Sequence, residues 1–238
     1  MKAVVLSGAT GGLGKALVSV LAGRENFDLI GLYRNKGKFE ELSRVIAPPI
    51  EGYWIEENED FSLLGKRIIS KEYESIILIL NAFSIMPIKC IGDFSTSDVM
   101  GFVYGNITRN ILLLNRVVGI CKRFSRKLRV INLDSGAADY PLTGWSNYCA
   151  GKAYINAFLA VAAAENPEFQ FVSFDPGVMD TGMQEIIRSV NKEVFSQVET
   201  FIGYKNNNVL RNPLDVAKQI DERYISQWLA QHLREKIR

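Results

Sequence analysis

Residues 2–14, Lys2-Ala3-Val4-Val5-Leu6-Ser7-Gly8-Ala9-Thr10-Gly11-Gly12-Leu13-Gly14, place four glycines directly after a short apolar run. The run predicts a buried strand, and the apolar pattern at helical spacing over 15–21 predicts a helix behind the glycines. Glycines allow the backbone to turn sharply and to approach a pyrophosphate, whose charge meets the N-terminus of the helix. Strand, glycine turn and helix in this order indicate a dinucleotide-binding fold rather than a tight turn alone.

The end of the next predicted strand, residues 28–33, indicates which dinucleotide binds. Folds of this kind place an acidic residue there to bind the ribose of NAD, but this strand is followed by Arg34-Asn35-Lys36. Asp28 lies at the opposite end of the strand. A guanidinium suits the 2′-phosphate of NADP because its planar donors fork onto phosphate oxygens. Arg34 therefore predicts NADP(H), with a solvated turn as the alternative interpretation.

A second group of residues carries the chemistry. Tyr148 and Lys152 lie four residues apart in a predicted helix, and Ser135 precedes the tyrosine by thirteen residues. Residues four apart share a helix face, so the ammonium is expected to lower the tyrosine pKa from its usual value near ~10. The phenol then becomes a usable general acid, and a serine hydroxyl could hold a carbonyl oxygen beside it. The arrangement suits protonation of an oxygen while hydride arrives at its carbon; the alternative is an exposed helix with a surface tyrosine and lysine.

Further motifs complete a family pattern. Together with Asn81-Ala82, Asn106 and Pro176-Gly177-x-x-x-Thr181, the residues above fall in the order and spacing of the short-chain dehydrogenase/reductase family. The chain resembles this family from residue 2 to about 220. Within it, the stretch 175–184 is most similar to the sepiapterin reductase and benzil reductase branch. That resemblance implies a reductase that transfers hydride from NADPH to a small-molecule ketone or vicinal dicarbonyl.

The resemblance also implies a role for each matched residue. Ser135 would bind the substrate carbonyl, Tyr148 would protonate it, and Lys152 would lower the tyrosine pKa and hold the nicotinamide ribose. Asn106 would complete a water-mediated proton relay. No metal is expected. The residues expected at the cofactor are Gly8, Thr10, Gly12, Leu13, Gly14, Arg34, Asn81, Ala82, Tyr148, Lys152, Pro176, Gly177, Val178 and Thr181.

Three features depart from the family pattern. Phe83 stands where the family has a glycine after Asn81-Ala82, and it either shapes the pocket or fills core. The glycine loop satisfies two spacings, since Gly12 completes the reductase pattern and Gly11 that of longer, epimerase-like relatives. The chain length, the serine-to-tyrosine interval and Asn106 favour the reductase. Residues 224–238 have the pattern of an amphipathic helix, so the last parallel strand is expected to be missing or replaced.

Alternating patterns define the fold class. Crossover units of this kind predict an α/β fold with a Rossmann-like, doubly wound parallel sheet flanked by helices, in a single domain over 1–238. The segment 182–211 interrupts the alternation and is expected to form a substrate lid, with a helical pair packed on the core as a compatible alternative. Strand-like runs lie near 3–7, 28–33, 52–55, 75–80, 128–133 and 170–174, and helical patterns near 13–23, 37–46, 61–70, 96–121 and 147–165.

Composition bounds the remaining possibilities. A formal net charge of +2 argues against a nucleic acid or membrane-surface partner, and the apolar runs are too short to span a bilayer. Cys90, Cys121 and Cys149 lack metal-ligand spacing and suggest reduced thiols in a cytoplasmic protein. His232 is the single histidine, so a Ser-His-Asp hydrolase would need the C-terminal tail to reach Ser135.

Alternative functions and the assembly stay open at this level. A redox sensor that binds NADP(H) without turnover is the main alternative, and an epimerase-like protein with tightly retained cofactor is another. The expected assembly is a homodimer or homotetramer, in which two helices form the contact. The small residues of one are Ala153, Ala157, Ala160, Ala162, Ala163 and Ala164, and the preceding helix adds Ile107, Leu112 and Val117. The expected pocket is mainly apolar, with Phe83, Met86, Trp145, Met179, Met183 and Phe201 as candidate walls.

Overall fold

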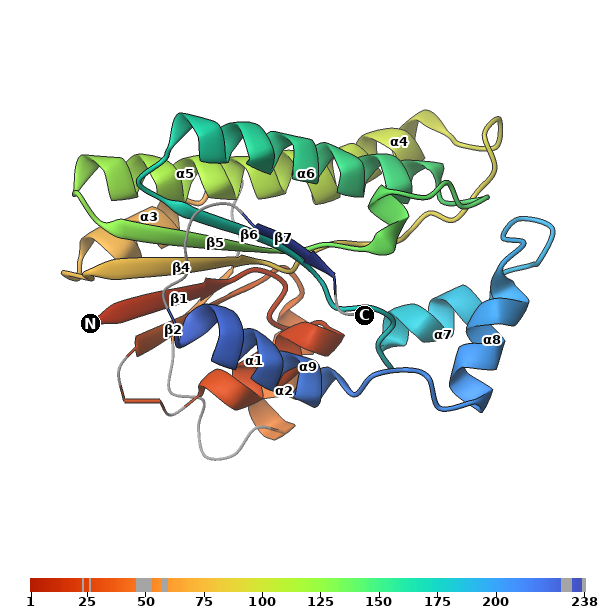
Figure 1. Cartoon of the computed structure of the whole chain (residues 1–238), viewed down its shortest axis with the longest axis horizontal. Helices are drawn as coiled ribbons and strands as arrows, with labels where there is room; N and C mark the ends of the chain where they lie inside the picture. Colours follow the sequence, from red (N-terminus) through yellow and green to blue (C-terminus); the bar gives the residue numbers. More distant parts are fainter. Residues whose placement is uncertain (23, 26, 46–52, 57–59, 228–232, 237–238) are drawn as a thin grey trace.

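A seven-stranded parallel sheet with the order β3-β2-β1-β4-β5-β6-β7 forms the centre of the molecule (Figure 1). The computed structural model describes residues 1–22, 24–25, 27–45, 53–56, 60–227 and 233–236. The strand order reverses between β1 and β4, the point where such sheets bind ligands at the carboxyl ends of their strands. The strands are β1 (Lys2–Leu6), β2 (Phe27–Tyr33), β3 (Tyr53–Glu56), β4 (Ser75–Leu80), β5 (Lys127–Leu133), β6 (Gln170–Asp175) and β7 (Leu233–Lys236).

Helices cover both faces of the sheet (Figure 1). On one face lie α1 (Gly12–Leu21), α2 (Lys36–Val45) and α9 (Pro213–Ile220); on the other lie α3 (Ser62–Ile69), α5 (Arg109–Arg123) and α6 (Ser146–Glu165). Side chains of β1 alternate between the two layers, because successive residues of a strand point to opposite faces. The predicted doubly wound α/β fold is confirmed.

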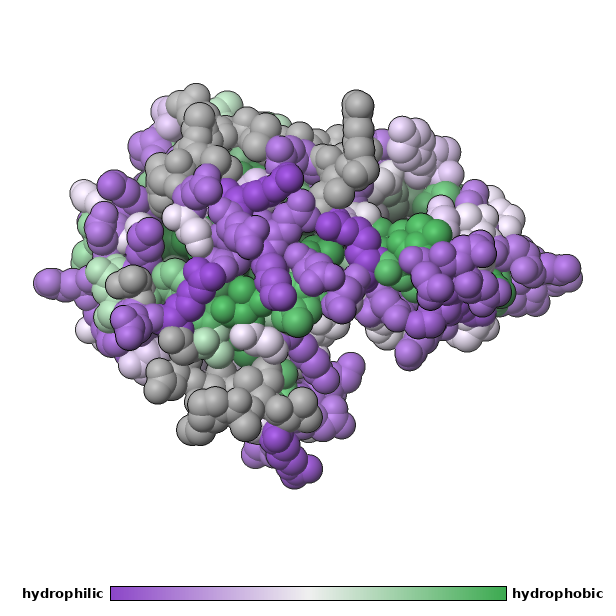
Figure 2. Space-filling view, turned by 60° about the horizontal axis from the view of Figure 1, so that its bottom comes forward, coloured by the Kyte–Doolittle hydropathy of each residue, from purple (hydrophilic) through white to green (hydrophobic). Residues whose placement is uncertain are grey.

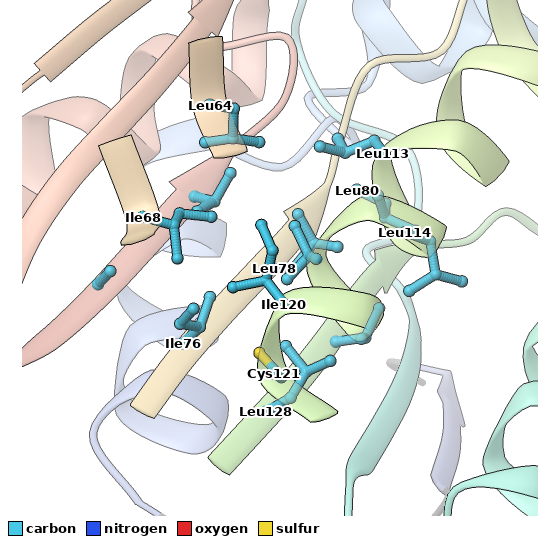
Figure 3. Close-up of a cluster of buried hydrophobic side chains, with 14 of the residues drawn as sticks. Leu64, Ile68, Ile76, Leu78, Leu80, Leu113, Leu114, Ile120, Cys121 and Leu128 are labelled. Atoms are coloured by element: carbon cyan, nitrogen blue, oxygen red, sulfur yellow. The ribbon is translucent and has the colours of Figure 1, made fainter. Parts of the chain in front are cut away.

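The layer between β4 and α5 is a continuous apolar core. Figure 3 shows side chains from two helices converging on two neighbouring strands, which fixes α5 over the sheet. Burial of each such side chain stabilises the fold by about 1.5–3 kcal/mol. The labelled residues are Leu64 and Ile68 of α3, Ile76, Leu78 and Leu80 of β4, Leu113, Leu114, Ile120 and Cys121 of α5, and Leu128 of β5.

The C-terminus differs from the prediction. A strand, β7, pairs in parallel with β6 from Val172↔Leu233 to Asp175↔Lys236, so the expectation that the last strand is missing or replaced by a helix is wrong. The preceding turn is a short π-helix over Asp221–Ile225. Four residues of an edge strand cannot be distinguished from a helix by periodicity alone, and pairing to the free edge of β6 decides between them. His232 and residues 228–231 and 237–238 lie outside the described residues.

The predicted helix over 96–121 is divided. It consists of α4 (Thr96–Phe102), a π-helical turn over Val103–Thr108 and α5. Ser95 begins α4 with a capping box. The Ser95 hydroxyl accepts from the backbone N–H of Asp98, and the Asp98 carboxylate accepts from the backbone N–H of Ser95. Short π-helical turns of this kind occur frequently at functional sites, and this one contains Asn106.

The segment after β6 leaves the sheet. It contains α7 (Gly182–Arg188) and α8 (Val198–Asn206), which project beyond the carboxyl ends of the strands (Figure 1). The backbone returns to its starting point, because Met179 and Arg211 form an isolated parallel bridge. Within the described ranges, the structure contains no helix long and apolar enough to cross a membrane.

Candidate active site

The glycine loop between β1 and α1 is closely packed against its neighbours. Gly8 has a φ of +64°, and a Cβ there would lie 2.9 Å from the Cα of Ala82. A Cβ at Gly14 would overlap the carbonyl oxygen of Gly8, and one at Gly12 would lie 2.6 Å from Cγ2 of Thr181. A Cβ at Gly11 would approach nothing closer than 3.4 Å. The packing therefore requires the reductase spacing and not the epimerase-like one.

The loop after β4 is joined to the glycine loop by hydrogen bonds. Asn81 donates from Nδ2 to the carbonyls of Ser7 (3.1 Å) and Gly8 (3.0 Å). Ser7 in turn accepts at Oγ from the backbone N–H groups of Asn81 (3.0 Å) and Ala82 (3.1 Å). Asn81 therefore shapes the backbone of the glycine turn from the neighbouring strand.

A cavity of about 810 Å³ opens at these strand ends. Figure 2 shows a notch between the body of the molecule and the lobe on the right that α7 and α8 form. Two glycines that line this cavity, Gly8 and Gly12, leave no room for a Cβ. This exposed glycine backbone and the basic residue at the end of β2 fit a nicotinamide dinucleotide. The predicted cofactor residues that line it are Gly8, Thr10, Gly12, Leu13, Arg34, Asn81, Ala82, Tyr148, Lys152, Pro176 and Thr181.

Tyr148 lies within a group of aromatic rings at the start of α6. Its ring is 5.6 Å from that of Phe83 and 5.3 Å from that of Trp145, both in edge-to-face contact. Burial raises the pKa of the phenol to about 12, a hydrogen bond with Ser135 lowers it, and Asp175 and Asp134 raise it. The phenol is therefore protonated throughout the neutral range, which is the form that a proton donor needs.

Lys152 lies one helical turn further along the same face. Its Nζ donates to the carbonyl oxygen of Leu133 (2.6 Å) and lies 4.1 Å from the ring centroid of Phe83. Burial lowers the pKa of this ammonium to about 8. The expectation of a lowered Tyr148 pKa is wrong, because burial of the phenol raises it.

Asn106 occupies the π-helical turn behind the cavity. Its side chain binds the backbone of Ser84 twice, accepting from the N–H (2.7 Å) and donating to the carbonyl (3.1 Å). Asn110, one turn later, donates to the carbonyls of Asn106 (2.6 Å) and Ala82 (3.1 Å). Two buried asparagines thus hold the loop 82–84 that carries Phe83 into the site.

Some of the predicted site residues do not line the cavity in the described part of the chain. Gly14, Asn106, Ser135, Gly177 and Val178 are not among the residues that line it. Of the candidate walls, Phe83, Met86, Met179 and Met183 line the cavity, whereas Trp145 and Phe201 pack behind Tyr148.

Sequence reasoning missed several residues that line the cavity, among them Lys15, Lys38 and Asp134. Lys38 lies in the first turn of the helix that follows Arg34, and Asp134 is adjacent to Ser135. Their closeness in sequence to predicted site residues could have indicated that they line the cavity. Asn110 follows Asn106 at helical spacing, which was the corresponding signal behind the cavity.

Comparisons with known proteins identify the family of this chain. The family model of the short chain dehydrogenases matches residues 2–192. A benzil reductase ((S)-benzoin forming) of Bacillus subtilis (strain 168) is 33% identical over 218 residues, which cover 90% of this chain and 89% of the relative. A sepiapterin reductase of Bos taurus is 44% identical over 62 residues, or 26% of this chain and 23% of that one.

Among solved structures, a short chain dehydrogenase/reductase from Saccharomyces cerevisiae is similar with a TM-score of 0.84 at 22% identity, covering 98% of this chain and 96% of that one. This likeness confirms the fold, and the matches to benzil and sepiapterin reductases confirm the branch that the sequence indicated. The chain belongs to the short-chain dehydrogenase/reductase family.

Proposed function

We propose that this protein is an NADPH-dependent carbonyl reductase that acts on a ketone or a vicinal dicarbonyl. The observation that carries the proposal is the buried Tyr148, which lines one cavity together with Lys152 and the glycine turn and is hydrogen-bonded with Ser135. The likeness to benzil reductases over most of the chain supports the substrate class.

The proposed mechanism assigns one task to each residue. Reduced nicotinamide, when bound, supplies a hydride to the carbonyl carbon. Ser135 holds the carbonyl oxygen, and Tyr148 donates its phenolic proton to that oxygen as negative charge develops on it. Lys152 lines the same cavity and would hold the hydroxyls of the nicotinamide ribose. Phe83 and Trp145 fix the phenol ring in place and exclude water from it.

The pocket proposed for the substrate is apolar beside the phenol. Phe83, Met86, Met179 and Met183 line it, and the methionine thioethers adapt to ligands of different shape. An aromatic or branched aliphatic diketone fits such walls. Because hydrophobic pockets discriminate weakly between similar groups, a panel of diketones is the appropriate substrate test.

The cofactor preference is tested at Arg34. We expect Arg34→Ala to weaken NADPH binding by about 10- to 100-fold, the range that corresponds to the 1.5–3 kcal/mol of a hydrogen bond to a charged group. NADH, which lacks the 2′-phosphate, should bind the variant and the wild type alike. Fluorescence titration with both nucleotides measures the difference. Lys36→Ala is the matched control, since Lys36 is exposed and lies outside the described cavity lining; equal losses for NADPH and NADH in Arg34→Ala would contradict the assignment.

We also propose that residues 182–211 form the substrate lid of the single domain. Phe195 on this segment is fully buried and stacks on Trp145 with ring centroids 4.6 Å apart, and Trp145 contacts Tyr148. Next to Phe195, the hydroxyl of Ser196 forms a 2.8 Å hydrogen bond with the hydroxyl of Thr143, which also holds the segment in place. Gly144 allows the segment to approach this closely, because a Cβ at Gly144 would lie 2.6 Å from the carbonyl oxygen of Val194.

Removal of the lid contact gives a specific expectation. Phe195→Ala should raise KM for the carbonyl substrate by about tenfold or more, because the lid loses the ring that holds it against Trp145, whereas the affinity for NADPH should stay within about twofold. Phe195→Leu retains apolar bulk and should be affected less. Val209→Ala removes an exposed apolar side chain of the same segment and serves as control. A folded Phe195→Ala protein with unchanged KM would exclude the lid.

The proposed assembly is a homodimer or homotetramer formed through α5 and α6. Tyr154, Phe158 and Val161 of α6 and Leu112 of α5 are exposed apolar side chains, and Ala153, Ala157 and Ala160 leave α6 open to close approach. Val117 and Ala162, expected at this surface, lie in the core instead. Light scattering should give a mass of two or four chains, reduced to one chain by Ala157→Arg; a monomeric wild type would contradict the proposal.

A further inference from the structure

A buried carboxylate lies beside the candidate catalytic residues without a role in the mechanism above. Asp134 follows the last residue of β5, is 4% exposed and lines the cavity together with Tyr148 and Lys152. Its Oδ1 accepts from Nδ2 of Asn156 (2.8 Å). Asn132 approaches Oδ1 of Asn156 (3.3 Å) and Oγ of Ser173 (3.2 Å) from its Nδ2, so the carboxylate is fixed from behind by a polar network.

The network holds this carboxylate next to the strand residue that binds the buried ammonium. Tyr148, Lys152 and Asn156 follow one another at four-residue steps, which puts them on one face of α6. Lys152 binds the carbonyl of Leu133, and Asn156, one turn later, binds the side chain of Asp134. Adjacent residues of the strand end therefore contact adjacent turns of the helix.

A buried charge is costly unless another charge compensates for it, and attraction between charges is strong where water is excluded. Lys152 is 5% exposed, and its hydrogen bond to the Leu133 carbonyl supplies only a dipole. Asp134, directly after β5, brings a negative charge to the same part of the site.

We propose that Asp134 is a positioning residue that keeps Lys152 charged and in place beside Tyr148, so that carbonyl reduction persists to higher pH. The inference rests on the proposed function, because it assigns Asp134 a part in the same site. It distinguishes Asp134 from Asn132 and Asn156, whose neutral side chains fix geometry but supply no charge.

The titration behaviour of the site supports this assignment. Burial lowers the pKa of Lys152 to about 8, and Asp134 and then Asp175 of β6 raise it. Burial raises the pKa of Tyr148, a hydrogen bond with Ser135 lowers it, and Asp175 and Asp134 raise it. Removal of the Asp134 charge therefore lowers both pKa values. Reduction needs the charged ammonium and the protonated phenol, so the alkaline limb of its pH profile must move to lower pH whichever group controls it.

The test is Asp134→Asn, which retains an oxygen to accept from Asn156 and removes the charge. We expect the alkaline limb of NADPH-dependent diketone reduction to move down by about one pH unit or more, the size of shift that one neighbouring charge produces. Asp215→Asn removes the same charge from an exposed position on α9 and should leave the limb unchanged. A limb that stays within about 0.3 pH units of wild type in Asp134→Asn would overturn the inference.

A second readout separates this inference from the proposed function. The Cε carbon signal of Lys152, assigned by its absence in Lys152→Met, is titrated by NMR in the free wild-type and Asp134→Asn proteins. Its midpoint should be lower in the variant, and equal midpoints would overturn the inference even if the protein reduces diketones. A wild type that consumes no NADPH with any diketone would contradict the proposed function alone, and the NMR titration would still decide the role of Asp134.

Discussion

Replacement of Tyr148 by phenylalanine should lower kcat for carbonyl reduction by about 100-fold or more, the usual contribution of a general acid. The variant lacks only the phenolic oxygen, so the ring contacts with Phe83 and Trp145 remain and the site keeps its shape. The affinity for NADPH should stay close to that of wild type, because the glycine turn and Arg34 are untouched. The decay of NADPH absorbance with benzil or another vicinal diketone measures the effect.

Tyr140→Phe is the matched control for this experiment. Tyr140 is 65% exposed and precedes the catalytic helix, so loss of its hydroxyl should leave the rate within about twofold of wild type. Retention of full activity in Tyr148→Phe would exclude the tyrosine as proton donor. If NADPH binds but neither wild type nor variant consumes it across a broad panel of carbonyls, the redox-sensor function becomes the better description.

The second large effect is expected at Gly14. Gly14→Ala places a methyl group onto the carbonyl oxygen of Gly8, a backbone atom that cannot move without distorting the cofactor turn. We expect NADPH binding to weaken by roughly 5- to 150-fold, in line with the 1–3 kcal/mol that overpacking typically costs. Isothermal titration calorimetry measures the affinity, and thermal unfolding should show a lower Tm in the same variant.

Gly11→Ala is the control within the same loop. A Cβ at Gly11 would lie 3.4 Å from the Gly8 carbonyl, so its neighbours need to give by only a small amount. The affinity for NADPH should change by less than about threefold. Equal damage from Gly11→Ala and Gly14→Ala would instead indicate the epimerase-like spacing, in which Gly11 is one of the required glycines.

The expectations that held rest on short-range signals. The apolar run and glycines of residues 2–14 define β1, the turn and α1 within one continuous segment, so local pattern is enough to specify them. The same holds for Tyr148 and Lys152, whose spacing places both on one face of α6. Matched motifs in a fixed order then specified the family without any knowledge of contacts between distant segments.

The expectations that did not hold depend on contacts that the sequence does not display. The strand β7 exists because β6 offers a free edge, and the division of the helix over 96–121 accompanies the bonds between Asn106 and the backbone of Ser84. Val117 has the same apolar character as the exposed Leu112, but the rotation of α5 against the sheet turns it into the core.

The sequence by itself determined the fold class, the family and the residue types that carry the chemistry, because strand and helix periods and turn residues act over a few positions. Only the tertiary structure decided the electrostatics of the site. Burial raises the pKa of Tyr148, although the adjacent lysine suggested the opposite. The fold also brings Asp134, which follows β5, and Asp175 of β6 close enough to the phenol to raise its pKa. Desolvation and long-range charge depend on what surrounds a group in space, and that environment is assembled from segments far apart in the chain.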